Sequence, residues 1–213
     1  MAIKTSWTAG QVLAAADLTD TFAAKAPSAS PTFTGTADFT GATVLGIGSG
    51  FTYIGSATAS ASSSIVMNGV FSASYQWYRV LLAVTASADV ALNMRLRASG
   101  TDDSTGSSYL MQRINANTTT VAGAQTVSAE WAGPLLYNSG TNVAAMDIFD
   151  PQLASVTTIL AQSLYYVGSA QTFSGRHNQT TAYDGIRFYP ASGTLTGTGP
   201  GNVAVRVYGY KNS

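Results

Sequence analysis

The sequence predicts an all-β protein, in which a jelly-roll-like β-sandwich over residues 51–213 follows a short helix and a fibrous, intertwined β stem. Three observations lead to this prediction. After residue 51, apolar residues recur at every second position, and clusters of turn-forming residues separate these runs. A phenylalanine–threonine–glycine repeat precedes them. Alternation is the pattern of a strand with one buried face, and many short strands without intervening helices are typical of sandwiches.

Residues 1–26 contain the one stretch with a helical pattern. Leu18 and Phe22 would lie on one face of a helix that Asp17 opens. Pro27 ends this helix, because the residue before a proline disfavours the α conformation. A helix of about ten residues is marginal alone in water, so its apolar stripe needs a surface to pack on. We therefore predict an N-terminal attachment segment.

Residues 27–50 are predicted to form a fibrous stem that ends in a glycine-rich hinge. Phe33 and Gly35 recur six residues later as Phe39 and Gly41. One ring in six residues cannot fill a core within one chain, whereas the same rings can stack against their copies in neighbouring chains. A flexible Gly/Thr linker is the alternative. The regular spacing of the phenylalanines favours the stem.

The sandwich is predicted from strands with one wet face. In Val90–Arg97 the even positions are apolar and the odd positions are small or polar. About nine or ten strands are expected, near residues 51–55, 64–67, 78–84, 90–97, 107–114, 144–148, 156–166, 183–189 and 203–207. Turn chemistry is found at Ser99–Asp103, Asn138–Gly140, Ser174–Gly175 and Thr198–Gly201.

Composition narrows the classes of partner. Only 9% of the residues are charged, against about 25% in a typical protein. Ten basic and ten acidic residues cancel, so no field attracts nucleic acid or an anionic membrane. No apolar run approaches the roughly 18 residues of a membrane span, and the polar start of the chain lacks a signal-peptide pattern. We expect neither a nucleic-acid partner nor membrane insertion. We expect the protein to be assembled in a cytoplasm.

Residues for catalysis or cofactor binding are scarce. The chain has no cysteine, and His177 and Glu130 are its only histidine and glutamate. His177 lies in a polar stretch without neighbouring carboxylates, so a general base would lack an orienting partner. Asp102–Asp103 and Asp147/Asp150 could form a calcium site together with backbone carbonyls, but adjacent aspartates in a Gly/Ser turn favour a solvated hairpin tip. We expect no enzyme activity, no catalytic residue, no metal and no cofactor.

Both ends of the chain resemble bacteriophage fibre proteins. The segment Trp7–Leu13, followed by Ala16–Leu18, resembles the opening of many phage tail and fibre proteins. Ala26–Thr36 is similar to the "ASPTFTG" repeats of phage tail-fibre shafts. Asp184–Phe188 and Val203–Lys211 resemble a jelly-roll-like domain at the ends of phage fibre and virion proteins, although Tyr210 replaces a common leucine.

The resemblance implies a homotrimeric virion protein assembled in the host bacterium. It would be a tail fibre or spike, and its head would contribute to attachment to host-surface glycans. A capsid decoration, cement or head-fibre protein with a purely structural role is the alternative. The N-terminal segment would dock on other virion proteins through Trp7, Val12, Leu13, Leu18 and Phe22. The residues Phe33, Gly35, Phe39 and Gly41 would form the trimeric stem.

Four arginines are candidates for contacts between subunits. Arg79, Arg95, Arg97 and Arg206 fall on the face opposite the apolar series of their strands. Arginine is favoured at interfaces because its planar fork makes several directed hydrogen bonds. An ordinary solvent-facing charge is the alternative. Asp147 and Glu130 are the expected acidic partners.

Aromatic and amide side chains near predicted loops are candidates for contact with the host. Sugars stack on exposed rings and hydrogen-bond to amides, and Trp and Tyr also anchor protein interfaces and cores. Trp77 is expected to point away from the core, because its neighbour Tyr78 belongs to a core series. The residues predicted to touch the host are Trp131, Arg176, His177 and Asn178.

Overall fold

The computed structural model describes residues 50–165 and 169–211, except for the side chains of Tyr165 and Lys211. These residues belong to one unit, Ser49–Ser213. The predicted helix and nearly all of the stem lie outside the described residues. The same holds for the predicted attachment and stem positions Trp7, Val12, Leu13, Leu18, Phe22, Phe33, Gly35, Phe39 and Gly41.

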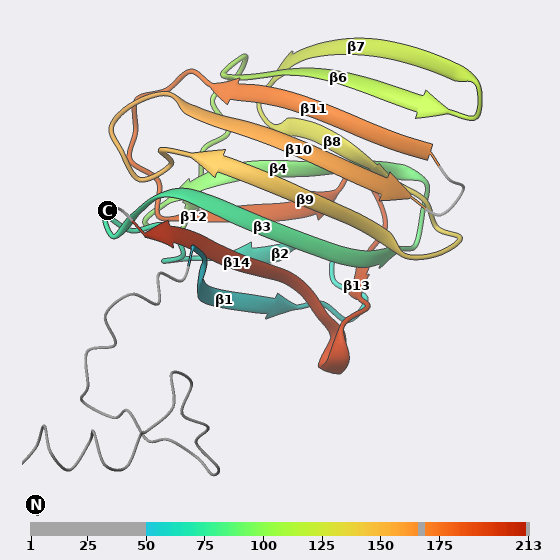
Figure 1. The fold of residues 1–213 in the computed structure, drawn as a ribbon, viewed down its shortest axis with the longest axis horizontal. Helices are drawn as coiled ribbons and strands as arrows, with labels where there is room; N and C mark the ends of the chain where they lie inside the picture. Colours follow the sequence, from blue (N-terminus) through green and yellow to red (C-terminus); the bar gives the residue numbers. More distant parts are fainter. Residues whose placement is uncertain (1–49, 166–168, 212–213) are drawn as a thin grey trace, which may run out of the picture. The chain divides into compact units, whose positions relative to one another are not determined.

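Two antiparallel sheets face each other in the described unit (Figure 1). The large sheet has nine strands in the order β1-β14-β3-β9-β10-β11-β6-β7, with β13 attached to β3. The small sheet has five strands in the order β2-β12-β4-β5, with β8 attached to β4. The large sheet consists of β1 (Thr52–Thr58), β3 (Tyr75–Ala86), β6 (Tyr109–Asn117), β7 (Thr120–Ser128), β9 (Asn142–Phe149), β10 (Thr157–Tyr165), β11 (Ser169–His177), β13 (Leu195–Gly197) and β14 (Val203–Lys211). The small sheet consists of β2 (Ile65–Met67), β4 (Val90–Ala98), β5 (Thr101–Asp102), β8 (Trp131–Leu136) and β12 (Gly185–Pro190).

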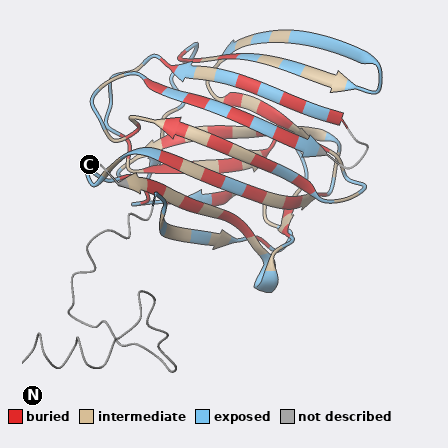
Figure 2. Ribbon diagram, viewed as in Figure 1, coloured by how far each residue is buried: buried red, intermediate tan, exposed pale blue. Residues whose placement is uncertain are grey.

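The core lies between the two sheets because alternate residues of each strand point inward. Tyr78, Val80 and Val84 of β3 have no exposed surface, and neither do Leu92 and Met94 of β4. Figure 2 shows the resulting alternation of buried and exposed residues along the strands of the large sheet. Burying such side chains contributes roughly 1.5–3 kcal/mol each relative to exposure.

The predicted all-β, jelly-roll-like sandwich is confirmed: the described residues contain no α-helix and form antiparallel sheets. Several strands were not predicted, among them β7, β8, β11 and β13. In β7 (TVAGAQTVS) and β11 (SAQTFSGRH) small and polar residues occupy positions that an alternating pattern expects to be apolar. The predicted turn at Ser174–Gly175 is wrong, because both residues lie inside β11.

Gly175 marks a close approach inside the sandwich. A Cβ atom there would lie 2.7 Å from the carbonyl oxygen of Leu110 and 2.9 Å from Nε1 of Trp131. Gly123 in β7, by contrast, has nothing closer than 3.8 Å to its hypothetical Cβ. The glycine in β11 therefore lets the indole of Trp131 pack directly on the backbone.

We expect Gly175→Ala to lower the free energy of unfolding by about 1–3 kcal/mol, because the added methyl group overpacks the site. Gly123→Ala is the matched control and should change the free energy by less than about 0.5 kcal/mol. Urea denaturation of both variants measures the difference. Equal stability of the two variants would contradict this account of Gly175.

Candidate functional site

The outer face of the large sheet, which points away from the core, is unusually apolar. Leu81 of β3 is 39% exposed, Leu160 and Leu164 of β10 are 52% and 51% exposed, and Ile114 of β6 is 48% exposed. Val143 of β9 joins them at 41%. Strands that are apolar on both faces are typical of sheets covered on both sides. This surface is therefore the leading candidate for a binding site.

Strand register arranges the outer face into rows of directly opposed residues, which share one face of an antiparallel sheet. One row is aliphatic and contains Ala83, Val143, Leu164, Ala170 and Ala116. The middle row is mixed and contains Leu81, Ala145, Gln162, Thr172 and Ile114. The third row is more polar and contains Arg79, Asp147, Leu160, Ser174 and Gln112.

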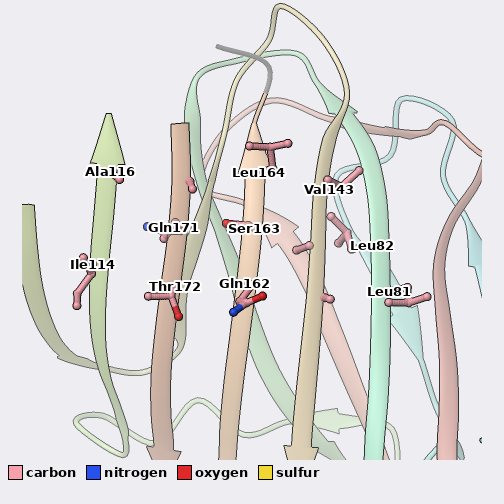
Figure 3. A pocket seen from close by; sticks show the side chains of 13 residues that line it. Leu81, Leu82, Ile114, Ala116, Val143, Gln162, Ser163, Leu164, Gln171 and Thr172 are labelled. Carbon is pink, nitrogen blue, oxygen red and sulfur yellow. The ribbon is translucent and has the colours of Figure 1, made fainter. Parts of the chain in front are cut away.

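These rows line a hollow that we call the outer groove. Its apolar half encloses about 720 Å³ between Leu81, Val143, Leu164 and Ile114, and Figure 3 shows these side chains around it. Its polar half encloses about 420 Å³ and includes Arg79, Asp147, Gln112 and Ser174. Four residues line both halves, so the two hollows are continuous: Ile114, Ala145, Gln162 and Thr172.

An aromatic cluster borders the polar half of the groove. The ring centroids of Phe51 and Tyr210 are 4.2 Å apart. The ring centroid of Trp77 is 6.1 Å from that of Tyr210 and 5.8 Å from that of Phe149. Tyr208 joins through Phe51 at 6.4 Å. Trp77 is 50% exposed, as its position opposite Tyr78 in the alternation predicted. The cluster offers ring faces to a ligand or to another protein.

Arg79 and Asp147 form the charged centre of the groove. They oppose each other directly on β3 and β9, and the guanidinium meets both carboxylate oxygens at 2.8 Å and 2.6 Å. The hydrogen bond to Asp147 raises the pKa of Arg79 above its usual value. Because the two charges cancel, a partner that covers the groove meets directed hydrogen-bonding groups rather than a net charge.

The predicted subunit arginines do not form one surface. Arg79 and Arg206 lie on the outer face of the large sheet, whereas Arg95 and Arg97 lie on the small sheet. The expected acidic partners are found within the same chain: Arg79 pairs with Asp147, and Arg95 pairs with Glu130 at 2.6 Å. The role of these arginines between subunits stays a prediction.

The small sheet carries its own charged network on its outer side. Arg187 stacks on the ring of Tyr189 at 4.8 Å and binds Asp102 at 2.8 Å. Arg97 binds the same carboxylate, and Tyr189 donates a hydrogen bond to Glu130 at 3.1 Å. Burial, together with the neighbouring charge of Glu130, raises the pKa of Tyr189 to about 12. These charges are satisfied internally, so this face is a weaker candidate for binding.

The predicted host contact is wrong for two of its four residues. Trp131 and His177 have no exposed surface, because β8 and the end of β11 turn them into the core. Arg176 and Asn178 are exposed. Arg176 opposes Thr158 and Leu110 on the outer face, beyond the polar half of the groove. The segment expected to be a polar loop is therefore the end of strand β11. Along this strand inward-pointing residues such as His177 alternate with outward-pointing residues such as Arg176.

His177 belongs to a buried polar cluster. Its Nε2 lies 3.0 Å from Oδ2 of Asp103 and 2.6 Å from the hydroxyl of Tyr183, which donates to the same carboxylate oxygen. The ring of Tyr109 stacks on the imidazole at 4.0 Å. Asp103 therefore supplies the neighbouring carboxylate that the local sequence lacks. Since His177 is fully buried, the cluster ties two loops to the core rather than facing a substrate.

Burial keeps His177 neutral. It lowers the pKa of the imidazole, and the hydrogen bond to Asp103 opposes this effect only in part. Nδ1 is buried and has no hydrogen-bond partner among the described residues, so a proton there would be left unsatisfied. Burial alone would raise the pKa of Asp103, but hydrogen bonds from Tyr183, Thr105 and His177 lower it to about 2.

Both shifts make the fold less stable in acid. Below about pH 6.5 the unfolded chain binds a proton at its histidine that the folded chain does not bind. We expect the free energy of unfolding to fall as the pH drops through about 6.5 towards the lowered pKa of the folded His177, by at most about 1.4 kcal/mol per pH unit. The contribution of Asp103 is present above about pH 4 and is lost as the pH falls towards 2.

The variant His177→Gln should lose the dependence that begins near about pH 6.5, because His177 is the only histidine in the chain. Asn178→Ala, at the exposed neighbouring residue, is the control and should keep it. Denaturant unfolding at several pH values measures both. An unchanged slope in His177→Gln would show that other groups cause the acid sensitivity.

Sequence reasoning missed most of the outer groove. Leu81, Leu160, Leu164 and Ile114 were not singled out, because each looks like an ordinary apolar strand residue. A signal was present in the run Val80–Val84, where consecutive residues are apolar and the strand must have two apolar faces. Among the described residues, no group of three or more His, Asp or Glu side chains is placed to hold a metal ion.

Comparisons with known proteins assign no family to this chain. Neither a family model nor a curated protein matches its sequence. Among solved structures it is similar to galectin LEC-6 of Caenorhabditis elegans, with 12% identity and a TM-score of 0.31 over 75% of this chain and 95% of the galectin. A TM-score this low supports no inference about ligand or function. No helix within the described residues is long and apolar enough to cross a membrane.

Proposed function

We propose that this chain is a structural virion protein of a bacteriophage, a homotrimeric tail fibre or spike whose head contributes to attachment to host-surface glycans. The N-terminal and stem motifs support the phage part of the proposal by their resemblance to fibre proteins. In this proposal the chain binds host glycans and other virion proteins, without catalysis and without a cofactor. Residues 1–26 would hold it on other virion proteins.

The outer groove is the observation that carries the glycan part of this proposal. It combines the uncharged hydrogen-bonding side chains Gln112, Gln162 and Ser174 with a neutralised Arg79–Asp147 pair. The aromatic cluster beside it adds the exposed ring of Trp77. A sugar presents hydroxyl groups around apolar C–H faces, so it matches directed polar groups next to aromatic rings. The proposed glycan contact is therefore this groove, in place of the loop around His177 that the sequence predicts.

A trimer would turn weak contacts into firm attachment. Three heads on one rigid stem reach neighbouring sugars on the same surface at a high effective concentration, so each single site can be weak. A shallow groove with few charges suits this mode of binding, because each sugar contact is modest and reversible.

A capsid decoration or cement protein is the second candidate, and the apolar half of the groove favours it. Leu81, Val143, Leu164 and Ile114 offer an aliphatic surface that matches a protein partner better than a sugar. In this alternative the groove binds capsid protein and no glycan.

We expect Trp77→Ala to weaken binding of the full chain to a surface glycan of the host about fivefold to tenfold, because it removes a stacking contact of roughly 1 kcal/mol. Val66→Ala on β2, also an exposed side chain, is the control and should leave binding unchanged. Glycan arrays and titration calorimetry provide the measurements. Binding to phage capsid without glycan binding would favour decoration, and depolymerised host polysaccharide would contradict a non-enzymatic role.

Light scattering on the full chain tests the trimer separately. The fibre proposal expects three times the chain mass or a multiple of it. A well-folded monomer would contradict the fibre and the stem together.

A further inference from the structure

One edge of the large sheet lacks the features that normally block edge-to-edge pairing. Edge strands are commonly protected by being short, by irregular pairing, by charged side chains or by proline. In the small sheet β2 has three residues and β5 has two, while β8 contains Pro134. At one end of the large sheet, β1 has two register irregularities against β14.

β7, at the other end of the large sheet, has no such protection. It is nine residues long, pairs with β6 without a register shift, and contains no charged residue and no proline. Figure 1 shows it as the last strand of the sheet. Val121 is 70% exposed and Val127 is 52% exposed, so the edge also carries apolar side chains.

The hairpin fixes which backbone groups of β7 point outward. Thr118 and Thr119 form a two-residue loop between the opposed residues Asn117 and Thr120. The residue pair that flanks such a loop is hydrogen-bonded. Along the hairpin, hydrogen-bonded residue pairs then alternate with non-hydrogen-bonded pairs. The N–H and C=O groups of the odd-numbered residues Val121, Gly123, Gln125 and Val127 therefore face away from β6. Within the described residues, β7 pairs with no other strand.

We infer that this edge pairs antiparallel with β7 of a second copy of the chain, about a twofold axis at Ala124. Val121 of each copy then lies opposite Val127 of the other, and Gly123 lies opposite Gln125. These four residues are the ones whose backbone groups face outward, so the register satisfies every outward donor and acceptor of the strand. The pair joins the two large sheets into one.

The chemistry of β7 fits a second copy in particular. The strand is self-complementary in this register, because its two exposed valines cover each other and no charge opposes a like charge. The net charge of the chain is zero, so two copies do not repel each other at long range. The pairing needs a twofold axis and a trimer needs a threefold axis, so this inference does not rest on the proposed stem.

Cysteine cross-linking of the full chain tests the register, because the natural chain has no cysteine. In Ala124→Cys the two introduced residues face each other as a non-hydrogen-bonded pair with Cα atoms about 4.5 Å apart, which suits a disulfide. Ala122→Cys is the matched control on the same strand and face. It would face Thr126 of the second copy, about 13 Å from its own counterpart. We expect mild oxidation to give covalent dimers with Ala124→Cys and none above background with Ala122→Cys.

Light scattering of Val121→Lys supplies the second readout. The charge at the edge should reduce the assembled mass to that of the basic unit, from dimer to monomer or from joined trimers to single trimers, and Val66→Lys on β2 should leave the mass unchanged. Equal masses for the natural chain and Val121→Lys, without cross-linking at residue 124, would overturn the pairing. Equal cross-linking at residues 122 and 124 would overturn the register. Assembly that Val121→Lys abolishes but that gives no cross-link at residue 124 would indicate pairing with a different strand, and would also overturn it.

Discussion

The packing of the two sheets against each other is the interaction on which the rest of the structure depends. Tyr78, Val80 and Val84 of β3 belong to the same buried core cluster as Leu92, Met94 and Leu96 of β4. Once these residues point inward, the pleat of the strand sends Trp77, Arg79 and Leu81 outward. The residues that the core buries therefore determine which residues lie on the outer face of the large sheet.

This coupling makes an exposed apolar surface informative. A sheet that packed on one side only would normally alternate apolar with polar residues, but β3, β9 and β10 carry aliphatic residues on both faces. The outer groove and the aromatic cluster together form a surface with few charges, and the few charges near its centre neutralise each other. Such a surface suits contact with uncharged sugars or with another protein, and it suits polyanions poorly.

Uncompensated charges are also scarce at the β7 edge and in the core. β7 presents backbone groups and valines without a charge, while the buried Asp103–His177–Tyr183 cluster keeps its histidine neutral by burial. Charges of the small sheet are used in internal pairs around Asp102 and Glu130. Among the described residues, these ion pairs therefore form within the chain, and the outer groove and the β7 edge present mainly hydroxyls, amides and apolar side chains.

Local alternation in the sequence is enough to predict the all-β sandwich, the inward series of β3, β4 and β14, and the outward position of Trp77. It did not determine β7 or β11, where small polar residues hide the period, nor the burial of Trp131 and His177. Only the tertiary structure brings Asp103 to His177, 74 residues away in the chain. It alone aligns β3, β9, β10, β11 and β6 into one groove, since the register between distant strands depends on packing that no local pattern encodes.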